Sequence, residues 1–141
     1  MIALDTNILV HAHRTDSPWH TRALDCVATL GSERWAIPWP CVHEFLAIAT
    51  HPKVFDPPTP IEDALVAIET WLEAPLLTLL GELDGYLTVL TSLVRAGRIA
   101  GPRVHDARIA ALCLQHGVTE LWTMDRDFSR FPRLRTRNPL A

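Results

Sequence analysis

The sequence has no apolar run that approaches the roughly 18 residues of a membrane-spanning helix. Its N-terminus lacks the basic segment, apolar segment and cleavage site of a secretory signal. Cysteine is scarce: Cys26, Cys41 and Cys113 are the only three, and each has an apolar or helical setting. Three cysteines do not make a disulfide framework. We therefore expect reduced thiols and a cytoplasmic protein without a membrane anchor.

Lysine is nearly absent, because Lys53 is the only lysine among 13 basic residues. The net charge of −3 does not by itself favour a nucleic-acid-binding protein, but the charge is unevenly distributed. Residues 1–94 hold 4 basic and 12 acidic residues, whereas residues 95–141 hold 9 arginines and 4 acidic residues. Arginine binds phosphate through a planar fork of donors. The C-terminal part thus offers either a phosphate-binding strip or a solvated surface, made of Arg126, Arg130, Arg133, Arg135 and Arg137.

The length of 141 residues and the 48% hydrophobic content indicate a single domain over residues 1–141. Short apolar segments predict strands at residues 2–5, 35–37, 76–80 and 120–123, with a last one near 134–136. Helical periodicity between them predicts helices at 20–30, 41–50, 61–73, 82–96 and 102–115, and another helix is expected to start at Thr6 and Asn7. In the helix at 61–73 we expect Leu65, Ile68 and Leu72 to be buried. This alternation predicts an α/β fold whose mostly parallel sheet is covered on both faces.

Four acidic residues lie at the ends of apolar segments, and they are the most informative feature of the chain. Asp5 ends the first apolar run, Glu44 and Asp106 open two helical stretches, and Asp125 closes the last apolar strand. Ligands of open parallel sheets bind beyond the carboxyl ends of the strands. Carboxylates gathered there repel one another unless a cation lies between them. An all-oxygen site favours Mg²⁺ or Mn²⁺ and phosphate chemistry, with the four acids as metal ligands and catalytic residues.

Each acid also has a structural explanation when it is considered alone. Asp5 is placed to cap a helix, and Asp125 is placed to form a turn. Glu44 and Asp106 fall in first helical turns, where the helix dipole favours negative charge. Independent capping, however, does not require all four acids to share one edge of a sheet.

Other residues are expected to support this site. Thr6 and Asn7 are placed to hold Asp5 or a metal-bound water. Asp127 is an expected auxiliary metal ligand. The candidates for binding RNA phosphates are the arginines beside the acids, which are Arg103, Arg108 and Arg126.

Histidine and tryptophan provide weaker signals. His11 and His13 do not form a zinc pair, because residues two apart on a helix face away from each other. His43 and His105 each precede a candidate ligand, so they either contact phosphate or a carboxylate or are ordinary surface histidines. Trp39, between two prolines near Glu44, is either a core or groove residue or a platform that stacks a base.

The order of the acidic motifs resembles that of the PIN-domain ribonucleases. The motifs are Asp5-Thr6-Asn7, Glu44 about 40 residues later, His105-Asp106-Ala107, and the segment from Thr123 to Phe128. Within that group the chain looks like a VapC-type toxin of a bacterial type II toxin–antitoxin pair, and the resemblance covers almost the whole chain. It implies a three-layer α/β/α sandwich and a Mg²⁺- or Mn²⁺-dependent endoribonuclease that cleaves transfer or ribosomal RNA. It also implies a homodimer that is neutralised by a small VapB-like antitoxin.

Two other functions remain open at this point. A phosphatase of the haloacid-dehalogenase type also starts with an aspartate after its first strand, but it needs a second aspartate where this chain has Asn7. A PIN-like module that only binds RNA or protein would share the fold without catalysis, although the complete set of acids argues against it. A receiver domain fits less well, because the only lysine lies in a proline-rich loop.

Overall fold

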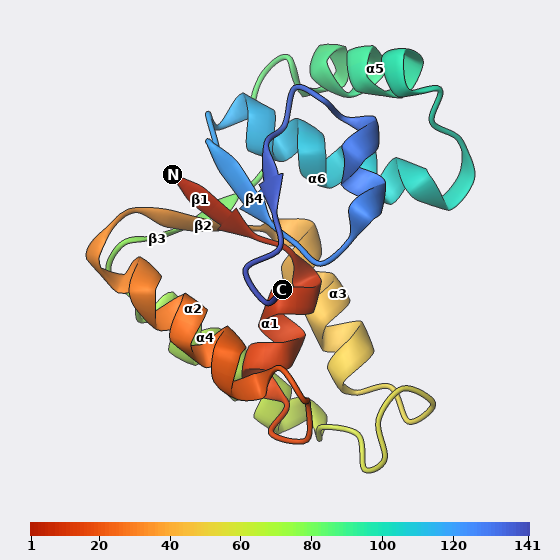
Figure 1. The fold of residues 1–141 in the computed structure, drawn as a ribbon. Coiled ribbons are helices and arrows are strands. Elements are labelled where there is room, and N and C mark those ends of the chain that lie inside the picture. The colour runs from red at the N-terminus through yellow and green to blue at the C-terminus, as the bar shows by residue number, and fades with distance from the viewer.

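The computed structural model describes all 141 residues and contains a five-stranded parallel sheet (Figure 1). The strand order across the sheet is β3-β2-β1-β4-β5. In register, Ala3 of the central strand lies opposite Ala36 on one side and Leu121 on the other. The strands are β1 (Ile2–Leu4), β2 (Trp35–Pro38), β3 (Leu77–Leu80), β4 (Glu120–Trp122) and β5 (Thr136–Arg137).

Six α-helices cover the two faces of this sheet. Helices α5 and α6 lie on one side of it, whereas α1, α2 and α4 lie on the other (Figure 1). Helix α3 starts directly after β2 and contacts α1, α4 and α6. The arrangement confirms the expected α/β/α sandwich. The helices are α1 (Thr6–His13), α2 (His20–Thr29), α3 (Trp39–Ala49), α4 (Ile61–Leu72), α5 (Tyr86–Gly97) and α6 (Val104–Gln115), with 3₁₀ turns η1 (Leu30–Ser32), η2 (Gly101–Arg103) and η3 (Arg126–Arg130).

The core forms where the sheet meets its helices. Every residue of β2 is buried, as expected for a strand with helices on both faces. Phe45 on α3 and the pair Phe128 and Phe131 near the C-terminus are almost completely buried. Full burial of such a side chain stabilises a fold by about 1.5–3 kcal/mol. Residues from both ends of the chain therefore share one core.

The expected helices and strands are all present, with shifted ends. Helix α3 starts at Trp39 rather than at residue 41, because Pro40 is tolerated in a first helical turn, where its missing N–H has no partner to lose. Helix α5 starts only at Tyr86, because Gly85 before it has a left-handed backbone with φ of 82°. One burial prediction was wrong: Leu65 and Leu72 are 37% and 46% exposed. Ile68 is buried as predicted, and the other buried residue of α4 is Ala64, directly before Leu65.

The sheet changes its direction of winding at β1. From β1 the chain moves outward to β2 and β3 on one side, and it later returns to form β4 and β5 on the other. The connections that leave the carboxyl ends of β1 and β4 therefore diverge, which opens a crevice at that edge. Asp5 follows β1 and Thr123 follows β4, so both enter this crevice.

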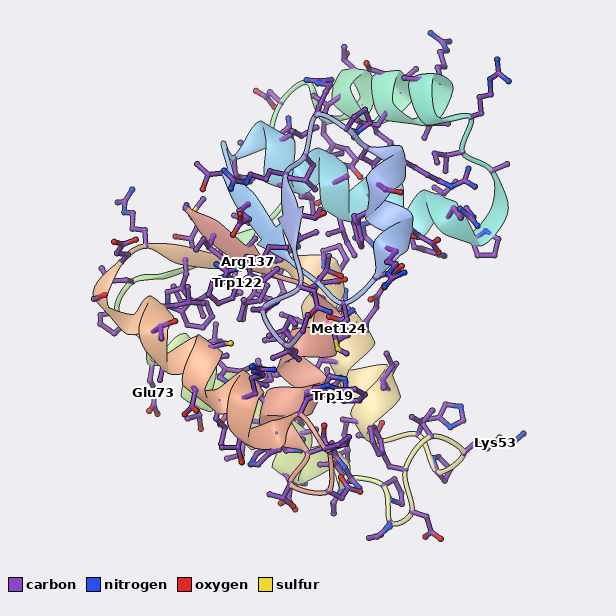
Figure 2. The ribbon with its side chains drawn as sticks, in the orientation of Figure 1. Trp19, Lys53, Glu73, Trp122, Met124 and Arg137 are labelled. Carbon is purple, nitrogen blue, oxygen red and sulfur yellow. The ribbon has the colours of Figure 1, made fainter.

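The proline-rich segment between α3 and α4 forms a loop that extends away from the sheet. Lys53 lies near its tip and points outward (Figure 2). None of the helices combines the length and the apolarity that a membrane crossing requires. On the neighbouring strands β4 and β5, the guanidinium of Arg137 lies 5.9 Å from the centre of the Trp122 ring (Figure 2).

Candidate active site

The structure brings the four predicted acids together in one hollow at the carboxyl edge of the sheet. Asp5 enters it after β1, Glu44 from α3, Asp106 from the first turn of α6, and Asp125 after β4. The hollow has a volume of about 340 Å³. Thr6, Asn7 and His11 also line it, and its apolar wall consists of Val10, Ile48, Val54, Phe55 and Ile109.

Asp5 is the buried acid of the site, with only 5% of its surface exposed. It caps α1, because its Oδ1 accepts a hydrogen bond from the Thr6 N–H at 2.8 Å. The Cys41 thiol lies 3.6 Å from the same oxygen. Its Oδ2 accepts from the Thr123 hydroxyl at 2.7 Å and from the Asn7 amide at 3.5 Å. The capping explanation is therefore correct for Asp5, and it does not compete with a position in the acidic site.

Thr6 and Asn7 connect the elements of the site, and they do so differently. The Thr6 hydroxyl donates to Glu44 Oε2 at 2.6 Å, so it orients Glu44 rather than Asp5. The Asn7 amide donates to Thr123 Oγ1 at 3.3 Å, while its oxygen accepts from the Met124 N–H at 3.2 Å. The end of β4 is thereby fixed to the start of α1.

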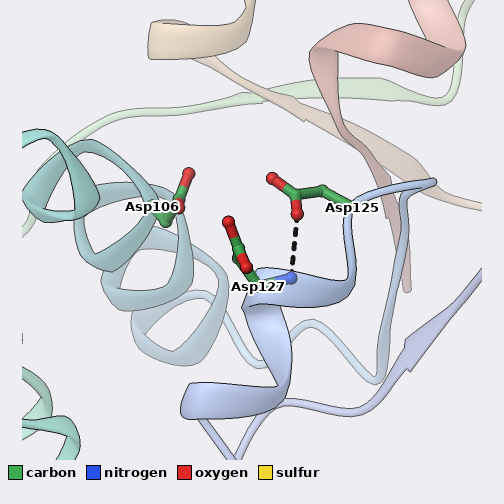
Figure 3. Close-up of side chains that lie close together, drawn as sticks. All are labelled: Asp106, Asp125 and Asp127. Carbon is green, nitrogen blue, oxygen red and sulfur yellow. Dashed lines mark hydrogen bonds between the residues drawn. The ribbon is translucent and has the colours of Figure 1, made fainter.

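Asp106, Asp125 and Asp127 form the more open part of the site. One carboxylate oxygen from each lies within 4.8 Å of the others, and Figure 3 shows the three groups facing one space. The only hydrogen bond among them runs from the Asp127 N–H to Asp125 Oδ1 at 2.8 Å, which caps η3. The turn explanation is thus also correct for Asp125. Asp106 accepts no hydrogen bond from the protein, and carboxylates that face one another in this way favour a cation.

The pKa values of two of the acids, Asp106 and Asp5, are raised. The pKa of Asp106 is raised to about 6, chiefly by burial and next by the charge of Asp125, with smaller contributions from Asp5, Asp127 and Glu44. Burial also raises the pKa of Asp5, although the hydrogen bonds from Thr123 and Thr6 oppose this. Asp106 therefore lies within the electrostatic field of the other four acids.

The donor set fits a hard divalent cation. Four carboxylates enter the hollow, and Mg²⁺ and Mn²⁺ prefer such oxygen ligands. Cys41, the nearest sulfur, is buried, and its thiol pKa is raised well above its usual value, which disfavours a thiolate ligand. The chain thus has an acidic cluster suited to a divalent metal.

The three candidate arginines lie at different distances from the acids. Arg103 Nη1 lies 3.9 Å from Asp127 Oδ1 and has no hydrogen-bond acceptor among the protein atoms. Arg108 is turned toward Glu82, with 3.5 Å between Nη2 and Oε1. Arg126 is exposed and makes no side-chain hydrogen bond or ion pair. Only Arg103 therefore borders the acidic site directly.

The sequence alone did not predict a role for Thr123, which connects Asp5 to Asp125. Its hydroxyl donates to Asp5 and accepts from the Asp125 N–H at 3.0 Å, and only 3% of the residue is exposed. The only sign of this role in the sequence is that Thr123 follows an apolar strand and precedes Asp125 by two residues.

His11 and His13 form hydrogen bonds with different partners, Ser17 and Thr59, in agreement with the rejection of a zinc pair.

Comparison with known proteins agrees with this geometry. The PIN domain family matches residues 2–134. Ribonuclease VapC48 of Mycobacterium tuberculosis is 32% identical over 139 residues, which cover 97% of this chain and 96% of that protein. Ribonuclease VapC43 of the same species is also 32% identical, over 99% of this chain and 96% of that protein.

Solved structures share the fold. VapBC2 from Rickettsia felis, bound to a DNA fragment from its promoter, superposes with a TM-score of 0.67 at 22% identity, covering 97% of this chain and 98% of that one. Mycobacterium tuberculosis VapC20, described as a sarcin–ricin loop cleaving toxin, has a TM-score of 0.67 at 16% identity, with 92% and 93% of the two chains covered. With the sequence relatives, these matches lead to one assignment: the chain belongs to the PIN domain family, among the VapC ribonucleases.

Proposed function

We propose that this protein is a metal-dependent endoribonuclease that uses Mg²⁺ or Mn²⁺ and acts as the toxin of a toxin–antitoxin pair. The observation that carries the proposal is the hollow shared by Asp5, Glu44, Asp106 and Asp125. The relatives named VapC ribonucleases support it over nearly the full length of both chains. The family assignment argues against the haloacid-dehalogenase phosphatase. That enzyme also needs an aspartate at position 7, where the Asn7 amide instead donates hydrogen bonds to Asp5 and Thr123.

In this proposal the five acids hold the metal, and Asp127 is the outermost. A divalent ion supplies charge neutralisation of the phosphodiester and lowers the pKa of water. Asp5 is fixed by hydrogen bonds to both of its oxygens, so it keeps its position without rearrangement. The Thr6 hydroxyl holds Glu44 through one oxygen, Oε2. Hydrolysis of this type leaves a 5′-phosphate and a 3′-hydroxyl.

The arginines beside the acids are proposed to position RNA phosphates. Arg103 is the best placed of them, because its buried Nη1 has no acceptor and lies beside Asp127. Arg126 is exposed and lies between Asp125 and Asp127 in the chain, so its side chain is free to bind a phosphate. An arginine at such a position neutralises a phosphate and fixes the register of the strand.

The proposed partners are a structured RNA, such as a transfer RNA or ribosomal RNA loop, a VapB-like antitoxin, and a second copy of this chain. VapC20 is described as cleaving the sarcin–ricin loop, and the Rickettsia structure pairs a VapC with its VapB. The three cysteines are free thiols, which is compatible with the cytoplasm where RNA substrates occur.

The test is cleavage of total RNA by the pure protein with Mg²⁺ or with EDTA, followed by sequencing of the new 5′ ends. We expect discrete new ends with Mg²⁺ only, and none from an Asp5→Asn variant that keeps the wild-type circular dichroism. Full cleavage by Asp5→Asn would refute the role of the acidic site. A protein that binds RNA but never cuts it would support the binding-module alternative.

A co-expression experiment tests the partner. We expect a small protein encoded beside this one to co-purify with it and to stop RNA cleavage. If cleavage continues at a saturating concentration of that protein, the toxin–antitoxin part of the proposal fails while the nuclease part remains.

A further inference from the structure

A second hollow shares Glu44 with the acidic one and lies between the N-terminal halves of α3 and α6. It has a volume of about 250 Å³ and is lined by Pro40, His43, Glu44, His105 and Arg108. Glu44 lines both hollows, so it forms the wall between them. The Glu44 carboxylate is held by Thr6 from the side of the acidic hollow. Besides Glu44 and Pro40, the second hollow is lined by three side chains that can donate hydrogen bonds, His43, His105 and Arg108.

The donors in this hollow suit a phosphate group. Arg108 makes one ion pair, to Glu82, in which both side chains are well exposed. A guanidinium has five N–H donors, so one exposed pair leaves others available. His43 and His105 are exposed and make no hydrogen bond through their rings. The hollow also lies near the N-terminal ends of α3 and α6, where the helix dipoles favour an anion.

An aromatic platform borders the same hollow. The rings of Trp39 and His43 are stacked, with centroids 6.3 Å apart and planes 27° apart. Trp39 is 41% exposed. Its indole lies beside Gly81, where an added Cβ would meet the ring at 3.6 Å, so the backbone after β3 supports the indole. Exposed aromatic faces beside basic groups are the usual platform for single-stranded nucleic acids, because every base can stack on them.

We infer that this hollow binds the nucleotide next to the scissile phosphate, with Arg108, His43 and His105 on its phosphate and Trp39 stacked on its base. The inference rests on the proposed nuclease function for the identity of the neighbouring site. A strand whose phosphate lies at the acids has its adjacent nucleotide within reach across Glu44, the shared wall. An acidic peptide would use the donors but would leave the aromatic platform unexplained. RNA uses both.

The test measures binding of a short fluorescein-labelled single-stranded RNA of mixed sequence in EDTA, by anisotropy over a range of salt concentrations. For Arg108→Gln we expect weaker binding and a salt dependence reduced by about 0.7 in the slope of log K against log salt, as for one phosphate contact. For Trp39→Ala we expect about tenfold weaker binding at an unchanged salt slope. Trp39→Phe keeps an aromatic face and should retain most of the affinity.

A matched control is Arg34→Gln, which removes the same charge. Arg34 is exposed before β2, at the opposite edge of the sheet, and makes no side-chain hydrogen bond or ion pair. The RNA affinity of the Arg34→Gln variant and its salt slope should stay near those of the wild type. A merely structural role of Arg108 would not change the salt slope selectively.

The outcomes separate this inference from the proposed function. If Arg108→Gln and Trp39→Ala bind RNA like the wild type, the nucleotide subsite is refuted. If they bind and cut RNA normally but escape a co-expressed VapB-like antitoxin, the hollow is a protein-binding site and the inference also fails. If RNA binding depends on both residues but no cleavage occurs with Mg²⁺, the subsite stands and the nuclease proposal fails.

Discussion

Asp5 and Asp106 belong to the same acidic site, but the protein surrounds their carboxylates in different ways. Asp5 is buried, and each of its oxygens accepts hydrogen bonds from the surrounding chain. Asp106 faces Asp125 and Asp127 and accepts no hydrogen bond from the protein. Burial raises the pKa of both, yet only for Asp106 are several neighbouring acids among the main causes.

The hydrogen bonds that hold Asp5 form when the protein folds, whereas the carboxylates around Asp106 need a bound cation to neutralise them. The hydrogen bonds of Asp5 tie α1 to the end of β4, so they form when the sheet forms. Asp106 gains no such partner on folding, and the nearby charges of Asp125 and Asp127 oppose the folded state. A metal that binds only the folded protein reverses that cost.

The largest expected effect comes from Asp106→Asn. We predict that it lowers RNA cleavage by at least about a thousandfold, because a metal ligand worth several kcal/mol is lost. Without metal the variant should be more stable than the wild type, because one repelling charge is removed. Thermal unfolding with EDTA and with Mn²⁺ measures this. A metal-induced rise in Tm as large as that of the wild type would show that Asp106 is no ligand.

Thr123→Val tests the hydrogen bonds around the buried Asp5, and it should have a smaller effect than Asp106→Asn. It removes the hydroxyl donor of a buried carboxylate, which typically costs about 1–3 kcal/mol of unfolding free energy. The loss should be similar in EDTA and in Mn²⁺, unlike the effect of Asp106→Asn. Chemical denaturation measures it. The control is Thr88→Val on α5, where the threonine is exposed and makes no side-chain hydrogen bond, and its stability should not change.

The pH dependence of the metal-free protein should be the smallest of the three effects. The pKa of Asp106 rises from 3.8 to about 6 on folding, so between these values the folded state binds more protons than the unfolded state. Its contribution to stability is full below about pH 4 and is lost as the pH rises through 6. The upper limit is about 3 kcal/mol, which solvent screening reduces because Asp106 is only half-buried.

Chemical denaturation in EDTA at several pH values from 4 to 7 measures the slope of the unfolding free energy against pH. We expect Asp106→Asn to flatten it without removing it, because the raised pKa of Asp5 contributes in the same direction. A slope that is unchanged in Asp106→Asn would mean that other groups cause it.

The fold and the convergence of the acids could be predicted from the sequence because their signals are local. Apolar runs marked β1 to β4, and Asp5 and Asp125 lay at the ends of two of these runs. Parallel strands place such ends at one edge, so convergence followed from topology. Helix faces were less certain: on α4 a shift of one residue moved burial from Leu65 to Ala64. The amphipathic stripe there is wide enough to fit either choice.

The hydrogen-bond network could not be predicted, because it depends on contacts between distant segments. Thr6 orients Glu44 across 38 residues, and Thr123 reaches Asp5 across 118. Nothing in the neighbourhood of either threonine distinguishes it from an ordinary helix-start or strand-end residue. The roles of the acids as ligands stay predictions, since geometry gives their positions and not their occupancy.

The most direct measurement is a crystal structure of the protein soaked with Mn²⁺, with anomalous diffraction recorded at the manganese edge. We predict an anomalous peak within coordination distance of carboxylate oxygens from Asp5, Asp106 and Asp125, and its loss in Asp106→Asn. A wild-type crystal without manganese density at these acids, at Mn²⁺ concentrations that support RNA cleavage, would contradict the account.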